Sequence, residues 1–328
     1  MKYTVDIDGA INDILKHNIG ICPALQIRNE YEGMIPYWWH NNPIVDLYHR
    51  DLSFDKWNVG AYLARQILND EKQFSSPLFQ LLFKSFVVAE GKFIKNYIPQ
   101  NSHEERLTGH LVSELENGLY ILRDYFEEAS KAIYGEKIPL NFYYADLSSN
   151  RQEKNTGADL GFIFYVNLPD FPKHIRIAAI QAKKAKKTSA TIDIDQLNKI
   201  ISAYEGNAYY MFYDMTSDRL SPMIRRASAI KNTLKDEKGS ITDSYGRDQI
   251  VERGVPLSLF LIFDMLNASI QDDGPIFHNI WDAKYHLMAP TNKENGPSKI
   301  LTISIGSIGR DEDLNDIQDL FNRDYPQD

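Results

Sequence analysis

The pattern of apolar and polar positions predicts a long amphipathic helix in the first half of the chain. Leucine recurs at four-residue steps, at Leu107, Leu111, Leu115 and Leu119. Residues four apart share one face of a helix, so these leucines form an apolar stripe. Ser102 followed by Glu105 matches a capping box, which predicts a helix from there to about residue 132. Helical spacing also occurs over residues 57–70 and 77–97.

Three runs rich in β-forming residues follow this helix and predict a three-stranded meander, at residues 140–146, 159–167 and 175–183. Residues 167–173 contain two prolines and predict the turn of an antiparallel hairpin between the last two runs. A second helix is expected over residues 194–204, before Gly206, and an aromatic strand over residues 208–213. The order helix, three strands, helix, strand predicts an α/β core.

The remainder of the chain has a weaker pattern. It predicts a basic helical stretch around Arg225 and Arg226, a polar loop over residues 236–248 and an acidic surface helix over residues 311–328. Two further apolar runs, residues 257–263 and 300–305, can each add a strand to the core sheet.

These patterns divide the chain into three regions. We expect a mixed and helical N-terminal region over residues 1–100, the α/β core over residues 101–215, and a C-terminal extension over residues 216–328 that can continue the core sheet. A chain of 328 residues is long enough to bury such a core without disulfides.

Composition narrows the class of protein. Hydrophobic residues make up 43% of the chain and charged residues 25%, which is typical of a folded domain. Cys22 is the single cysteine, so an intrachain disulfide and a cysteine-based zinc site are both excluded. The first residues carry Asp6, Asp8 and Asp13 where a signal peptide would be apolar, and no run reaches the length of a membrane span. We therefore expect a cytoplasmic protein with no membrane partner.

Polar side chains gather at one end of the predicted hairpin. Alternation along its second strand places Gln181 and Lys183 on the same face as the apolar residues Ile175, Ile177 and Ala179. Asp159 opens the antiparallel strand, so its carboxylate is expected beside them. A carboxylate, an amide oxygen and an ammonium group would then converge.

This combination suits metal-dependent hydrolysis of a phosphodiester. Magnesium, with manganese as an alternative ion, prefers oxygen ligands, which Asp159 and Gln181 supply. Lys183 can stabilise the negative charge that builds on the phosphate. Glu104 shares the inward stripe of the leucines, so we expect it to bring a second carboxylate ligand from the helix.

Each of these residues also has a purely structural interpretation. Glu104 can be a first-turn acid that the helix dipole favours, and an Asp that follows Gly-Ala is often a turn residue. Any strand can end in a Gln and a Lys. The predicted order of elements around them favours the catalytic interpretation.

The chain resembles the PD-(D/E)XK nuclease superfamily. Glu104 on a helix, Asp159 on one hairpin strand, and Gln181-x-Lys183 on the other match that pattern one by one, and the form with Gln is similar to variants in Mrr-like nucleases. Gln196 and the Tyr209-Tyr210 strand are also similar to such nucleases.

This resemblance covers residues 101–215 and implies a restriction-endonuclease-like fold. It also implies a metal-dependent endonuclease, most often of DNA, that serves bacterial antiphage defence or restriction. Gln181 departs from the usual carboxylate, so weaker metal binding is expected.

Basic residues are concentrated just after the predicted site. The formal net charge is −9, yet Lys183 is followed closely by Lys184, Lys186 and Lys187. These three lysines are expected to contact the phosphate backbone without reading bases. The alternative is a solvated loop.

Several functions remain open from the sequence. The chain could be a DNA nuclease, an RNase of the same fold, or a catalytically weak module that binds nucleic acid. A hydrolase with a carboxylate pair, such as a glycosidase, would need two acids about 5–10 Å apart, and no residues single out such a pair. Assembly with a second copy or with a defence partner protein is also open.

Overall fold

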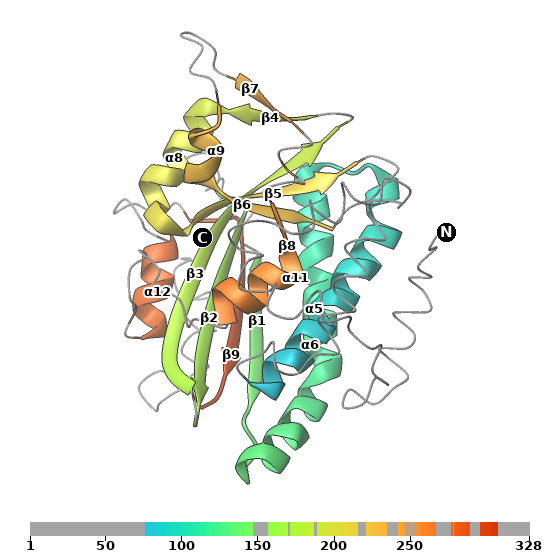
Figure 1. Cartoon of the computed structure of the whole chain (residues 1–328), viewed down its shortest axis with the longest axis vertical. Coiled ribbons are helices and arrows are strands. Elements are labelled where there is room, and N and C mark those ends of the chain that lie inside the picture. Colours follow the sequence, from blue (N-terminus) through green and yellow to red (C-terminus); the bar gives the residue numbers. More distant parts are fainter. Residues whose placement is uncertain are drawn as a thin grey trace, which may run out of the picture.

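The structure is a computed structural model of the chain, shown in Figure 1. It describes residues 76–146, 157–169, 171–186, 189–215, 221–234, 242–246, 250, 254–266, 277, 279–288 and 296–307. The helices expected over residues 57–70 and 311–328, and Lys187, lie outside the described residues.

Seven strands form one mixed sheet in the order β1-β9-β2-β3-β5-β6-β8. Their bounds are β1 Leu140–Asp146, β2 Leu160–Leu168, β3 Phe171–Ala185, β5 Ala208–Asp214, β6 Met223–Arg226, β8 Val255–Pro256 and β9 Lys299–Ile305. β3 is antiparallel to β2 and parallel to β5. The C-terminal ends of β3 and β5 therefore lie at the same edge of the sheet as the start of β2.

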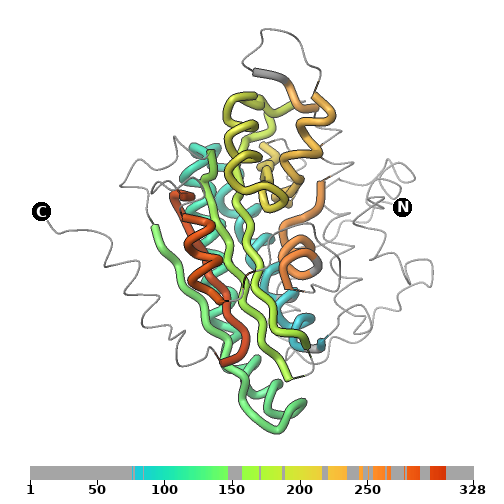
Figure 2. Tube along the Cα trace, turned by 90° about the vertical axis from the view of Figure 1, so that its left-hand side faces the viewer, coloured from blue at the N-terminus to red at the C-terminus, as the bar shows by residue number. Residues whose placement is uncertain are grey.

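Helices cover both faces of this sheet (Figures 1 and 2). They are α5 Pro77–Asn96, α6 Glu104–Tyr134, α8 Ile194–Tyr204, α9 Ala227–Lys231, α11 Leu257–Leu259 and α12 Ile280–Met288, with the short turns η3 Ile98–Gln100 and η5 Glu205–Asn207 and the π-helix η6 Phe260–Leu266. Alternate residues of β3 enter different cores, because side chains alternate along a strand. Ala178 and Ile180 pack with α5, α6 and η6, whereas Ile177 and Ala179 pack with α8 and α12.

The long helix forms where the leucine stripe predicts it. The four leucines are fully buried, and the helix ends at Gly135, whose φ of 81° is the left-handed conformation that glycine adopts readily. The predicted capping box is wrong. His103 is the N-cap residue and makes no side-chain cap bond, so Ser102 lies one residue too early to cap. Glu105 Oε1 instead lies 3.6 Å from Lys299 Nζ.

The core strands and the second helix also form where the pattern predicts them, except that β3 begins at Phe171, inside the predicted turn. The hairpin of β2 and β3 is antiparallel, with Leu168 opposite Phe171. The predicted three-stranded meander, however, is wrong. β9 lies between β1 and β2, antiparallel to the first and parallel to the second. All seven residues of β9 are buried, and four of them are isoleucine or leucine; such a strand is most stable inside a sheet that is covered on both faces.

Three of the weaker predictions are also wrong. Arg225 and Arg226 lie on strand β6, where their guanidinium groups stand over the rings of Tyr245 and Tyr209. The polar segment 236–248 contains strand β7 Thr242–Gly246, which pairs with β4 Ser189–Asp193 in a separate two-stranded sheet. The apolar run 257–263 is helical, since a short apolar run suits a buried helix as well as a strand.

Candidate active site

Asp159 stands just before β2 and binds the end of β3. Its main-chain N donates to Ile180 O at 2.9 Å. Its carboxylate Oδ2 accepts hydrogen bonds from Ala182 N at 2.7 Å and from Gln181 Nε2. The hairpin thus brings Asp159 and Gln181 into direct contact, as the strand alternation predicts.

Glu104 approaches the same strand from the first turn of α6. Its Oε1 accepts a hydrogen bond from Lys184 N at 2.8 Å. This contact spans 80 residues of sequence and sets the start of the helix against the end of β3.

The two carboxylates occupy successive positions along one edge of β3. The amides of Ala182 and Lys184 are two residues apart, so they point to the same side of β3. β2 does not reach this part of that side, because its first residue, Leu160, lies opposite Ile180. Amides spaced in this way lie about 7 Å apart. Asp159 and Glu104 therefore replace the missing strand as acceptors, and Lys183 lies between the two amides that they bind.

The electrostatic environment of the Tyr213 hydroxyl includes both carboxylates. Its hydroxyl lies 2.9 Å from Thr108 Oγ1, which donates to Glu104 O at 2.9 Å. Burial raises the pKa of the Tyr213 phenol, and the negative charges of Asp159 and Glu104 raise it further, while the bond to Thr108 opposes them. The charges of both acids therefore act on the same buried phenol.

Gln181 carries the feature that best fits a metal ion. Its side chain is 2% exposed, and its Nε2 also donates to Ala182 O at 3.0 Å. Its Oε1 is buried and has no hydrogen-bond partner among the described residues. A half-turn of the amide would present this oxygen beside the Asp159 carboxylate. Two carboxylates and an amide oxygen are donors that magnesium and manganese accept, so the residues fit such an ion.

A cluster of three or more His, Cys, Asp or Glu side chains suited to a metal does not occur in the part of the chain that the structure describes. The predicted ligand set contains two carboxylates and one amide, and it stays a prediction.

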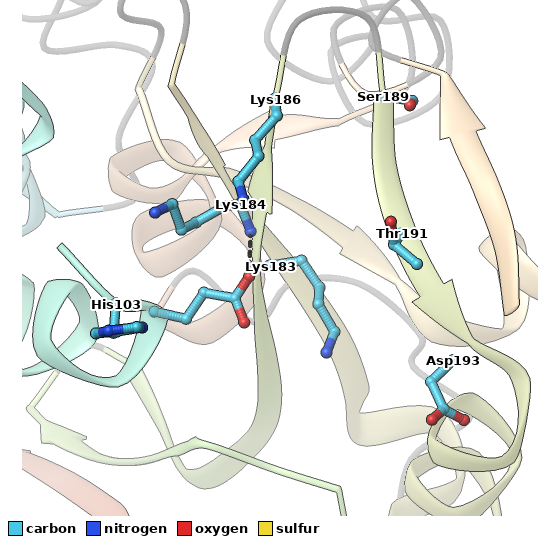
Figure 3. A pocket seen from close by; sticks show the side chains of 8 residues that line it. His103, Lys183, Lys184, Lys186, Ser189, Thr191 and Asp193 are labelled. Carbon is cyan, nitrogen blue, oxygen red and sulfur yellow. Dashed lines mark hydrogen bonds between the residues drawn. The ribbon is translucent and has the colours of Figure 1, made fainter. Parts of the chain in front are cut away.

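A pocket of about 390 Å³ opens beside these groups (Figure 3). It is lined by His103, Glu104, Lys183, Lys184, Lys186, Ser189, Thr191 and Asp193. In Figure 3 the Lys183 side chain extends from β3 between the walls that carry His103 and Asp193. Glu104 and Lys183 thus share the pocket, whereas Asp159 and Gln181 contact each other at the adjoining strand ends.

The predicted phosphate-binding lysines occupy different surroundings. Lys186 is exposed at the pocket. Lys184 is partly buried and donates to main-chain and side-chain oxygens of the segment before α6. Lys187 lies outside the described residues, so its predicted role stays a prediction.

Asp193 is a pocket residue that the sequence reasoning missed. Its Oδ1 accepts from Gln196 N at 2.9 Å and caps α8. Burial raises the pKa of the Tyr210 phenol, and the charges of Asp193 and Asp159 raise it further, so both acids lie near Tyr210. Side chains alternate along β4, so Ser189, Thr191 and Asp193 lie on one face and line the pocket. A prediction of this strand would have identified Asp193 as a candidate.

Gln196, which the resemblance singled out, packs against the loop before Asp159. Gly157 has a φ of 74°, and a Cβ there would lie 2.9 Å from Gln196 Cγ. Glycine is therefore needed at this position for two reasons, and the contact fixes the first turn of α8 beside the start of β2.

Comparisons with protein-family models, curated proteins and solved structures found no match to this chain. Within the described residues, every helix is too short or too polar to cross a membrane.

Proposed function

We propose that this chain is a metal-dependent nuclease that hydrolyses phosphodiester bonds at the edge of β3. The observation that carries the proposal is the pair of carboxylates, Asp159 and Glu104, on alternate amides of one strand, with Lys183 between them at a basic pocket. Acids held at main-chain amides are oriented before any ligand arrives, and such preorganisation is what catalysis by charge requires.

Asp159, Glu104 and the Gln181 amide would hold the divalent ion. When bound, such an ion lowers the pKa of a coordinated water and neutralises charge on the phosphate. The main-chain amides of Ala182 and Lys184 hold the two carboxylates, whereas the Gln181 amide would have to turn to present its oxygen. Magnesium is the expected ion, with manganese as the alternative.

Lys183 would act directly on the phosphate. Its ammonium group extends into the pocket, where it can bind a nonbridging phosphate oxygen and stabilise the charge that develops during attack. Lys186 is exposed at the same pocket and can attract the adjoining phosphate of the chain.

The substrate is proposed to be DNA, and the setting bacterial antiphage defence or restriction, on the sequence resemblance alone. RNA hydrolysis by the same residues is the alternative, because a pocket for the ribose hydroxyl leaves no short motif. The uncharged Gln181 supports a second candidate, a module that binds nucleic acid with little catalysis.

Incubation of the purified chain with circular DNA, linear DNA and RNA tests the proposal. We expect cleavage with magnesium or manganese and none with EDTA, and cleavage of circular DNA would identify an endonuclease. Glu104→Gln and Glu105→Gln form a matched pair on one helix. The first should lower the rate by about 10-fold or more, and the second should leave it unchanged. Equal cleavage with EDTA would refute the metal requirement.

A further inference from the structure

Two neighbouring lysines of β3 point in opposite directions. Side chains alternate along a strand, so Lys183 and Lys184 cannot share a face. Lys183 extends into the pocket, whereas Lys184 extends towards the segment that leads into α6 (Figure 3). The two residues are therefore separate in role, although they are adjacent in a run of basic residues.

The ammonium group of Lys184 is bound by the chain itself. Its Nζ lies 2.8 Å from Asn101 Oδ1, 3.0 Å from Ser102 O and 3.4 Å from Asn101 O. A lysine ammonium has three donors, and three protein oxygens lie close to this one. Asn101 has a φ of 49°, in the left-handed region, so the ammonium stabilises a turn that is unfavourable for most residues.

The main chain of the same residue holds Glu104. Lys184 N donates to Glu104 Oε1 at 2.8 Å, and Glu104 is three residues after Asn101. Lys184 therefore contacts the start of α6 at two places, the turn that precedes the helix and the carboxylate on its first residue. The exposed Lys186, two residues further on, makes no such side-chain contact among the interactions of the described residues.

The Lys184 side chain is half-buried, and the oxygens of Asn101 and Ser102 lie on one side of its ammonium group. A phosphate contact would have to compete with these oxygens for the donors of the ammonium group.

We propose that Lys184 is a positioning residue, which fixes the Glu104 carboxylate by anchoring the turn before α6, rather than a contact to the substrate phosphates. The inference rests on the proposed nuclease function. It divides the basic run into three roles: Lys183 for the reacting phosphate, Lys184 for the position of Glu104 and Lys186 for the adjoining phosphate.

Lys184→Met and Lys186→Met are matched variants that test this division. Lys184→Met should lower kcat by about 10-fold or more and raise the magnesium concentration needed for half-maximal rate, with KM and the salt dependence of binding kept. Lys186→Met should raise KM and reduce the salt slope of log K by up to about 0.9. Lys184→Arg, which keeps a cation with several donors, should recover part of kcat.

Lys184→Met that raises KM and flattens the salt dependence, with kcat unchanged, would overturn the proposal. Hydrogen exchange at the amides of residues 107–110, which bond within the first turns of α6, separates this failure from failure of the nuclease function. If the wild-type chain cleaves no nucleic acid, faster exchange in Lys184→Met than in Lys186→Met still supports the anchor. Equal exchange in the two variants overturns it.

Discussion

At the scale of single residues, the site depends on which atom of Gln181 faces Asp159. The amide presents its nitrogen to the carboxylate, which pairs a donor with an acceptor and avoids repulsion between two oxygens. A glutamate at this position would place two negative charges in contact. Such a pair is stable only when a proton or a cation lies between them.

Gln181→Glu should therefore couple the stability of the fold to the metal ion. Without a divalent ion at pH 8, we expect the variant to lose about 1–3 kcal/mol of unfolding free energy. Magnesium or manganese should raise its melting temperature by more than that of the wild type, because the added charge strengthens a hard-cation site. Thermal unfolding with EDTA and with magnesium measures both effects. Equal metal-induced shifts in variant and wild type would remove Gln181 from the ligand set.

Only part of this site could be predicted at the residue scale. The contact between Asp159 and Gln181 follows from the hairpin, because strand alternation is a local rule. The bond from Lys184 N to Glu104 depends on how α6 docks against the sheet, which the local pattern does not encode. The contact of the Lys184 ammonium with Asn101 and Ser102 has the same origin, so lysines that are adjacent in sequence have different surroundings in the structure.

Among the helices, the contact between α5 and α11 includes a buried acid. Glu90 on α5 is 4% exposed, and its two oxygens accept from Ser258 N and Ser258 Oγ, both at 2.8 Å. Burial raises the pKa of Glu90 from 4.5 to about 7, and the hydrogen bonds from Ser258 only partly offset it.

This shift predicts a stability that falls with rising pH. The folded state holds the Glu90 proton more tightly than the unfolded chain, so its contribution is largest below pH 4.5 and is lost by about pH 7. Glu90→Gln should remove that loss and be more stable than the wild type at pH 8, by up to about 3 kcal/mol. Urea unfolding of both proteins at pH 5 and pH 8 measures this difference in stability. A variant with the same pH dependence as the wild type would contradict the assignment to Glu90.

The elements themselves were mostly predictable, but their neighbours in the sheet were not. α6, α8 and the strands of the hairpin follow from periodicity and turn residues, which act over a few positions. β9 was also visible as an apolar run, yet its place between β1 and β2 was not. Pairing across more than 130 residues is decided by packing of the whole sheet, since each local pattern is compatible with several strand orders.

At the scale of the whole molecule, a chain of net charge −9 concentrates basic side chains at one pocket. Residues of α6, β3 and β4 line the pocket. The start of α6 is distant in sequence from the two strands, and β4 was not predicted. Ala182 and Lys184 lie beyond the start of β2, and there their main-chain amides bind Asp159 and Glu104 instead of a strand. In open α/β sheets, ligand sites commonly lie at the carboxyl ends of the strands.

Asp159 is proposed to be required for metal-dependent cleavage. The most direct test is the magnesium-dependent cleavage rate of Asp159→Asn compared with that of the wild type. Asparagine keeps one oxygen as an acceptor for Ala182 N and removes the charge, so the fold should survive. We predict a rate at least about 100-fold lower, with an unchanged melting temperature in EDTA. A folded Asp159→Asn variant that cleaves at the wild-type rate would rule out Asp159 as a ligand of the catalytic metal.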